Sequence, residues 1–133
     1  MTDLPNGVMS LLIDVIAEIE SGGNAKAIGD RHLKNKAYGI LQIRQPCMDD
    51  FNRWNGTKHK AEDALDNELL SRQVFKEYMK HYATVERLGR DVTMEDCAGC
   101  WNLGPNWFRK SPKIFEPYLK KFRDISKRMN LYV

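Results

Sequence analysis

VMSLLIDVIAEIESGGN, residues 8–24, is the segment from which the architecture of this chain can first be inferred. Its apolar residues recur at the spacing of one helical face, which predicts a helix packed against a core. They are Val8, Leu11, Leu12, Val15, Ile16 and Ile19. Gly22 and Gly23 supply the conformations that end helices, so we expect the helix to stop near Ser21. Glu20 is then a charged residue at the end of a core-facing helix.

Four more helices are predicted downstream, each from an apolar periodicity, a capping residue or a proline in its first turn. Their ranges are 46–54, 67–83, 93–101 and 111–129. A polar, aperiodic loop follows the first helix, and the apolar run 38–43 then predicts a short extended piece. The predicted fold class is mainly α, an α+β arrangement of one helical domain with a small β-hairpin.

Length and composition fit a single globular domain over residues 1–133, with 42% hydrophobic and 29% charged residues. The apolar segment near the start is interrupted by Ser10, Asp14 and Glu18, and Asp3 stands before it in place of a basic cluster. We therefore expect neither a secretory signal nor a membrane span.

The chain has three cysteines, and this odd number excludes a complete disulfide framework within one chain. Cys97 and Cys100 have the C-x-x-C spacing of metal and redox sites, but no second pair completes a zinc pattern. On a predicted helix the same spacing puts two small residues on one face. Packing as reduced thiols is the favoured interpretation, with metal or redox chemistry as the alternative, and we expect no metal or cofactor.

The net charge is +3, and residues 109–128 hold eight basic residues against Glu116 and Asp124. Such a face attracts anionic polymers, which include nucleic acid and the bacterial cell wall, or it is simply a solvated helix surface. The charge is not concentrated on a recognisable recognition helix, so we expect no nucleic-acid partner.

Three short strings follow one another in the chain: IESGGN at 19–24, YGILQI at 38–43 before Pro46, and WNLGP at 101–105. In this order they resemble the lysozyme-like superfamily. Soluble lytic transglycosylases and goose-type lysozymes show E-S at a helix end, then G-L-M-Q-I followed by proline, then A-Y-N-A-G. The resemblance implies an α+β lysozyme-like fold with an active-site cleft.

Two weaker matches extend this resemblance. The N-x-x-x-G-x-x-Y-L helix of the family is matched by Asn67, Val74 and Phe75, with Ser71 in place of the glycine. Tyr118-Leu119 with Phe122 resembles the C-terminal Y-V-x-x-V.

Invertebrate-type lysozymes give a second, locally closer comparison, through E-S-G-G, I-G, G-Y-F-Q-I-K-x-P, Y-M-K-x-Y-A-T and N-G-G-P. Their counterparts here lie at 20–23, 28–29, 39–46, 78–84 and 102–105. The disulfides typical of these secreted enzymes are nearly absent, which indicates a reduced compartment or a microbial setting.

The resemblance implies a peptidoglycan glycosidase that cleaves the β-1,4 bond between N-acetylmuramic acid and N-acetylglucosamine, with Glu20 as the catalytic acid. Glycoside cleavage needs a carboxyl group that stays protonated near neutral pH. The apolar helix face and the 38–43 segment should partly desolvate Glu20, which would raise its pKa.

Asp30 is the candidate second catalytic carboxylate. Hydrolytic relatives of the invertebrate type place an aspartate at the position that aligns with His32 here, and Asp30 lies two residues earlier. Lytic transglycosylases need no such aspartate, because the N-acetyl group of the substrate assists and an anhydro-sugar forms. Asp30 is therefore either a catalytic partner or a solvated turn residue, and the choice between hydrolysis and transglycosylation stays open.

The resemblance also implies a set of substrate-binding residues. Gln42 and Asn102 would offer amides to sugar hydroxyls and N-acetyl groups. Trp101 would stack on a sugar face or pack in the core. Ser21 would hold local geometry. The full set is Ser21, Tyr38, Gln42, Trp101, Asn102 and Tyr118.

The expected partners are peptidoglycan glycan strands, bound by a monomer. With no signal sequence expected, the protein would be made in the cytoplasm and reach the wall by lysis, a secretion system or a phage particle. The alternative function is that of a non-catalytic glycan-binding or inhibitory member of the same fold, in which Glu20 is vestigial. Retention of Glu20, Gln42 and Asn102 together argues against that alternative.

Overall fold

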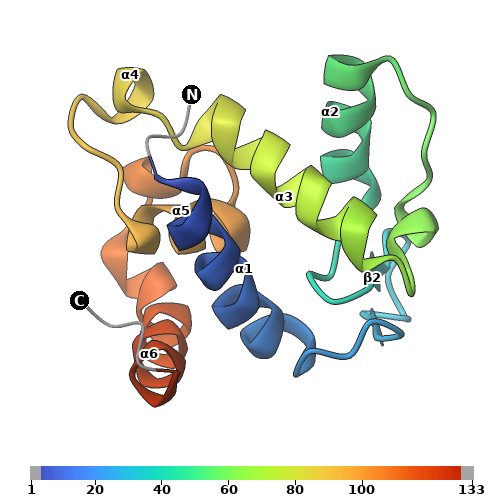
Figure 1. Cartoon of the computed structure of the whole chain (residues 1–133), viewed down its shortest axis with the longest axis horizontal. Helices are drawn as coiled ribbons and strands as arrows, with labels where there is room; N and C mark the ends of the chain where they lie inside the picture. Colours follow the sequence, from blue (N-terminus) through green and yellow to red (C-terminus); the bar gives the residue numbers. More distant parts are fainter. Residues whose placement is uncertain (1–3, 130–133) are drawn as a thin grey trace.

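The computed structural model describes residues 4–129, which form a mainly helical molecule with a small antiparallel sheet (Figure 1). Helices α1 and α3 run through the middle, with α2 and the hairpin on one side and α5 and α6 on the other. The elements are α1 (Asn6–Ser21), β1 (Ile28–Gly29), β2 (Ala37–Tyr38), α2 (Gln45–Asn55), η1 (Ala61–Ala64), α3 (Glu68–Tyr82), α4 (Val85–Leu88), α5 (Met94–Leu103), η2 (Trp107–Arg109) and α6 (Pro112–Arg128). The predicted fold class is confirmed.

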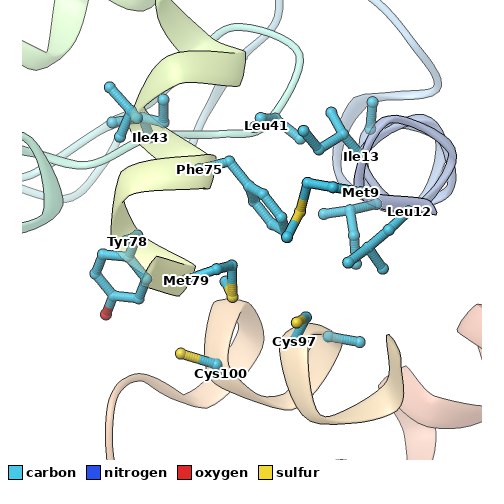
Figure 2. Packing of buried hydrophobic residues seen from close by; sticks show 14 of the residues in the cluster. Met9, Leu12, Ile13, Leu41, Ile43, Phe75, Tyr78, Met79, Cys97 and Cys100 are labelled. Atoms are coloured by element: carbon cyan, nitrogen blue, oxygen red, sulfur yellow. The ribbon is translucent and has the colours of Figure 1, made fainter. Parts of the chain in front are cut away.

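Helix α1 supplies a large part of the core. Figure 2 shows Phe75 of α3 pointing toward Met9 and Leu12 of α1, with Cys97 and Cys100 of α5 closing the cluster from the other side. Full burial of one large apolar side chain is worth about 1.5–3 kcal/mol. The several buried side chains of α1 therefore contribute substantially to the stability of the fold. Both cysteines are fully buried free thiols, in agreement with the packing interpretation of the C-x-x-C spacing.

The buried face of α1 is broader than the sequence predicts. Leu11 was expected in the core but is 43% exposed, whereas Met9 and Ile13 are buried. Helix α1 contacts both α3 and α6, so Met9 and Ile13, which lie outside the predicted stripe, are also covered.

The end of α1 agrees with the prediction. Gly22 has φ +63°, and its N–H donates to the carbonyl of Glu18 at 3.0 Å. This left-handed glycine turns the chain away sharply, so Glu20 stays in the last turn of the helix.

Of the predicted extended piece 38–43, Tyr38 belongs to strand β2, whereas residues 39–42 form a tight turn, so the prediction is wrong for that part. Tyr38 and Ile43 exchange both backbone hydrogen bonds at 2.9 Å, and the four residues between them reverse the chain. Gly39 has φ +81° and Gln42 has φ +56°, conformations that an extended strand cannot contain. The two-stranded hairpin is formed earlier, where Ile28 pairs with Tyr38 and Gly29 with Ala37.

Of the four helices predicted downstream of α1, α3 and α5 begin with side-chain caps, whereas α2 and α6 do not. The Asn67 side chain accepts from the Leu70 N–H at 3.1 Å, and Thr93 and Asp96 form a reciprocal capping box at α5. Ser111 precedes α6 as expected, but its side chain makes no capping hydrogen bond. There the proline at the first helical position sets the start.

Candidate active site

A cleft of about 460 Å³ lies where the end of α1, the hairpin and α5 converge. Residues from α1, β1, β2, the segment 42–44, α2, α3 and α5 contribute to its wall, so its shape depends on the whole fold. Its lining residues are Glu20, Gly29, Asp30, Ala37, Gln42, Ile43, Arg44, Cys47, Tyr78, Trp101 and Asn102. Four of the predicted site residues, Gln42, Trp101, Asn102 and Asp30, are thereby brought together with Glu20.

Ser21 fixes the end of α1 against the wall of the cleft. Its hydroxyl donates to the Ile40 carbonyl at 2.8 Å and contacts the Ala17 carbonyl at 3.1 Å. The first contact joins the last turn of α1 to the tight turn 39–42. Ser21 is not among the lining residues, and its contacts are those of a residue that holds the position of Glu20.

Glu20 is half-buried, and Tyr118 of α6 donates a hydrogen bond from its hydroxyl to Glu20 Oε2 at 2.7 Å. Burial raises the pKa of Glu20 above its ordinary value, against the opposing effects of the Tyr118 hydrogen bond and the positive charges of Arg44 and Lys121. A carboxyl group with a raised pKa remains protonated closer to neutral pH. A carboxyl group in this state has the chemistry of a general acid.

Asp30 lines the same cleft but has a different electrostatic environment. It is exposed, has φ +50°, and forms an ion pair and hydrogen bond with Arg44. The Arg44 guanidinium lowers the pKa of Asp30, so this carboxylate is ionised at neutral pH. The two carboxyl groups of the cleft thus differ in pKa: that of Glu20 is raised, which favours its protonated form, and that of Asp30 is lowered, which favours the carboxylate.

Gln42 is held tightly by the turn from which it projects. Its Nε2 donates to the Gly39 carbonyl at 3.0 Å and to the Ala27 carbonyl at 3.3 Å. Gly29 makes this placement possible, because a Cβ atom there would lie 2.1 Å from Gln42 Oε1.

Trp101 both packs and lines the cleft. Its Nε1 donates to the Leu41 carbonyl at 3.0 Å, and its ring lies edge-on to Tyr78 with centroids 5.5 Å apart. The stacking and packing interpretations of this residue are therefore compatible. Asn102, one residue later, is exposed in the cleft wall.

Tyr38 is turned away from the cleft. Neighbouring residues of a strand point to opposite faces, so Ala37 faces the cleft while Tyr38 lines a second hollow of about 240 Å³ on the other face. That hollow also includes Lys34, Lys36 and Lys60. Tyr118 likewise is not among the cleft-lining residues and reaches the site through Glu20.

The structure adds Arg44, Cys47 and Tyr78 to the residues predicted from the sequence. The sequence offered no clear signal for Arg44, because Gln42 lies in a tight turn and the side-to-side alternation of an extended strand does not apply there. Cys47 and Tyr78 had none, since their exposure to the cleft depends on how α2 and α3 meet.

Ser71 replaces the glycine of the family helix and is accommodated by a hydrogen bond. Its side chain is fully buried, and its hydroxyl donates to the Ala64 carbonyl at 3.3 Å. The substitution therefore leaves no unsatisfied polar group behind the tight turn.

The helices, the small antiparallel sheet and the cleft at the end of α1 are those of a lysozyme-like fold. The family model of the transglycosylase SLT domain matches residues 3–116, and the chain belongs to this family. Membership in this family implies that the substrate is peptidoglycan and that the general function is a lytic-transglycosylase-like activity. No curated protein matches the sequence.

Two absences hold for residues 4–129, the part of the chain that the structure describes. No group of three or more His, Cys, Asp or Glu side chains in this range could hold a metal ion. None of the helices there combines the length and apolar character needed to cross a membrane.

Proposed function

We propose that the chain cleaves the β-1,4 bond between N-acetylmuramic acid and N-acetylglucosamine by transglycosylation, with Glu20 as acid and then as base. The observation that carries this proposal is the contrast between the two carboxyl groups of the cleft. Glu20 is half-buried and hydrogen-bonded to Tyr118, whereas Asp30 is exposed and paired with Arg44.

In the first step Glu20 gives its proton to the glycosidic oxygen, the bond from that oxygen to C1 of the muramoyl residue breaks, and positive charge develops on the sugar ring. In the second step the Glu20 carboxylate takes the proton of the C6 hydroxyl of the same sugar as its oxygen bonds to C1. The products are a shortened strand and a 1,6-anhydro end. Glu20 is protonated again and no water is consumed.

The state of Asp30 favours this route over hydrolysis. A carboxylate that activates water must be able to accept a proton, and one that attacks C1 must approach the sugar freely. The ion pair with Arg44 lowers the pKa of Asp30 and so makes it a weak base.

Replacement of the acid tests the first part of the proposal. Glu20→Gln preserves size and hydrogen bonding but removes the proton, so release of soluble fragments from purified peptidoglycan should fall by about 10²–10⁴-fold. Glu18→Gln, an exposed site in the same helix, is the matched control and should retain wild-type activity. Circular dichroism should show both variants folded. Retention of a tenth of wild-type activity by Glu20→Gln would sink the catalytic assignment.

Mass spectrometry of digested peptidoglycan tests the second part. Anhydro-muramoyl ends without incorporation of ¹⁸O from labelled water are expected. Reducing ends that carry ¹⁸O would indicate hydrolysis and give Asp30 a catalytic role. A wild-type protein that binds glycan strands but releases no fragments would instead fit a non-catalytic glycan-binding member of the fold.

A further inference from the structure

Arg44 joins the cleft to the loop that connects β1 and β2. Its Nη2 forms an ion pair with the side chain of Asp30, and its Nη1 donates to the backbone carbonyl of Asn35 at 2.7 Å. Asp30 and Asn35 lie near the two ends of this connecting loop, so one guanidinium group holds both ends.

The connecting loop has little else to order it. Residues 31–35 are all exposed, and each strand of the hairpin has only two residues. A two-stranded hairpin is marginally stable by itself. The side chain of Asp30 also has to be held at the cleft from a backbone with φ +50°, which a residue other than glycine rarely adopts.

Arg44 is also well placed to act on Glu20. It is the residue before α2, it lines the cleft with Glu20, and its charge interacts with that carboxyl group. From the other side, α6 contributes the Tyr118 hydroxyl and the charge of Lys121. Asp30 offsets part of the Arg44 charge because the two form an ion pair.

We propose that Arg44 is a positioning residue that clamps the β1–β2 loop at the edge of the cleft and, together with Asp30, sets how much positive charge acts on Glu20. Asp30 is then a regulator of that charge and not a nucleophile. This inference rests on the proposed role of Glu20 as the acid.

An arginine suits this task better than a lysine. The planar guanidinium group presents several N–H donors in a fixed geometry and can bridge a carboxylate and a carbonyl at once. A lysine keeps the charge but offers it as a flexible point, so Arg44→Lys separates the electrostatic role from the clamp.

The pH dependence of kcat/KM on peptidoglycan tests the electrostatic role. The alkaline limb reports loss of the Glu20 proton from the free enzyme. In Arg44→Gln the loss of positive charge disfavours the carboxylate, so this limb should move to higher pH. In Asp30→Asn the Arg44 charge is no longer offset, so the limb should move to lower pH. A purely structural role would not produce opposite shifts.

Hydrogen–deuterium exchange of residues 31–36 tests the clamp without any need for activity. Exchange should be faster in Arg44→Gln and in Arg44→Lys than in the wild type, while Arg44→Lys should keep the wild-type alkaline limb. Because the β1–β2 loop is no longer fixed at the edge of the cleft, kcat/KM of Arg44→Gln at its optimum pH should be lower than that of the wild type by about tenfold or more. Arg53→Gln, which breaks the surface ion pair with Asp50, is the matched control and should change none of these measurements.

Shifts in the same direction for Arg44→Gln and Asp30→Asn, or no shift in either, would overturn the electrostatic role. Unchanged exchange in Arg44→Gln would overturn the clamp. An inactive wild-type protein would count against the proposed function. If the wild type is active but the alkaline limbs of Arg44→Gln and Asp30→Asn stay at the wild-type pH, the result counts against this inference alone.

Discussion

At the residue scale, the protonation of Glu20 is a balance in which burial has the largest effect. The half-buried position at the end of α1 raises its pKa, while the Tyr118 hydroxyl, Arg44 and Lys121 each favour the ionised form. A catalytic acid that must later act as a base needs both influences, because it has to release its proton and then accept one.

Tyr118→Phe should move the alkaline limb of kcat/KM to higher pH. The hydroxyl donates to the carboxylate of Glu20 and so stabilises its charged form, and its removal raises the pKa further. Loss of orientation should also lower kcat/KM by about tenfold. Steady-state rates across about pH 4–9 would check both effects, because this range extends well above the ordinary glutamate pKa of about 4.3.

Tyr82→Phe provides the control for this experiment. It also removes a hydrogen bond from a tyrosine hydroxyl to a carboxylate, Asp50 Oδ2 at 2.9 Å, but neither residue lines the cleft. Its pH profile should match that of the wild type. A Tyr118→Phe profile that also matched the wild type would contradict the role assigned to this hydrogen bond.

At the element scale, the tight turn 39–42 links three parts of the site. It carries Gln42, receives the hydrogen bond of Ser21 through Ile40, and offers the Leu41 carbonyl to Trp101. Gly39 lets it sit close to η1, because a Cβ atom there would lie 2.4 Å from the Ala64 carbonyl oxygen.

Gly39→Ala should destabilise the protein by at least about 3 kcal/mol. The substitution combines the strain of a positive φ with a clash against the backbone. Gly56→Ala is the matched control, because Gly56 has φ +65° but open space around it, and it should cost only about 1 kcal/mol. Urea denaturation of the two variants gives the difference. Equal losses of stability would show that the Ala64 contact is relieved without cost.

At the scale of the whole molecule, packing raises the pKa of all three thiols and so disfavours their ionisation. Burial is the main cause, and it raises the pKa of Cys47 and of Cys97 to about 12 and raises the pKa of Cys100 as well. Cys47 lines the cleft, whereas Cys97 and Cys100 are fully buried in the centre of the helical packing.

We therefore expect native protein to react very slowly with a disulfide reagent at neutral pH, since the thiolate is the reactive form. Addition of denaturant should make all three thiols react rapidly. A Cys47→Ser variant distinguishes the thiol in the cleft wall from the two in the core. Rapid native reaction of that variant would contradict the tight packing of α5 against α1 and α3.

Much of the fold and the position of Glu20 could be predicted from the sequence because the signals are local. The apolar spacing of α1, its glycine stop at Gly22 and the Thr93–Asp96 capping box each involve residues within one or two helical turns. Local periodicity and capping chemistry are enough to specify such features.

The remaining features were decided by tertiary structure, because they depend on residues far apart in the chain. The turn at Gly39 approaches Ala64, and Met9 and Ile13 of α1 are buried because α1 contacts both α3 and α6. Asp30 is near the glutamate in sequence, but its ion pair with Arg44, which lowers the pKa of Asp30, forms only in the folded chain. The sequence alone therefore determined a helix that ends in a candidate acid, and only the packing of distant segments decided which charges surround it.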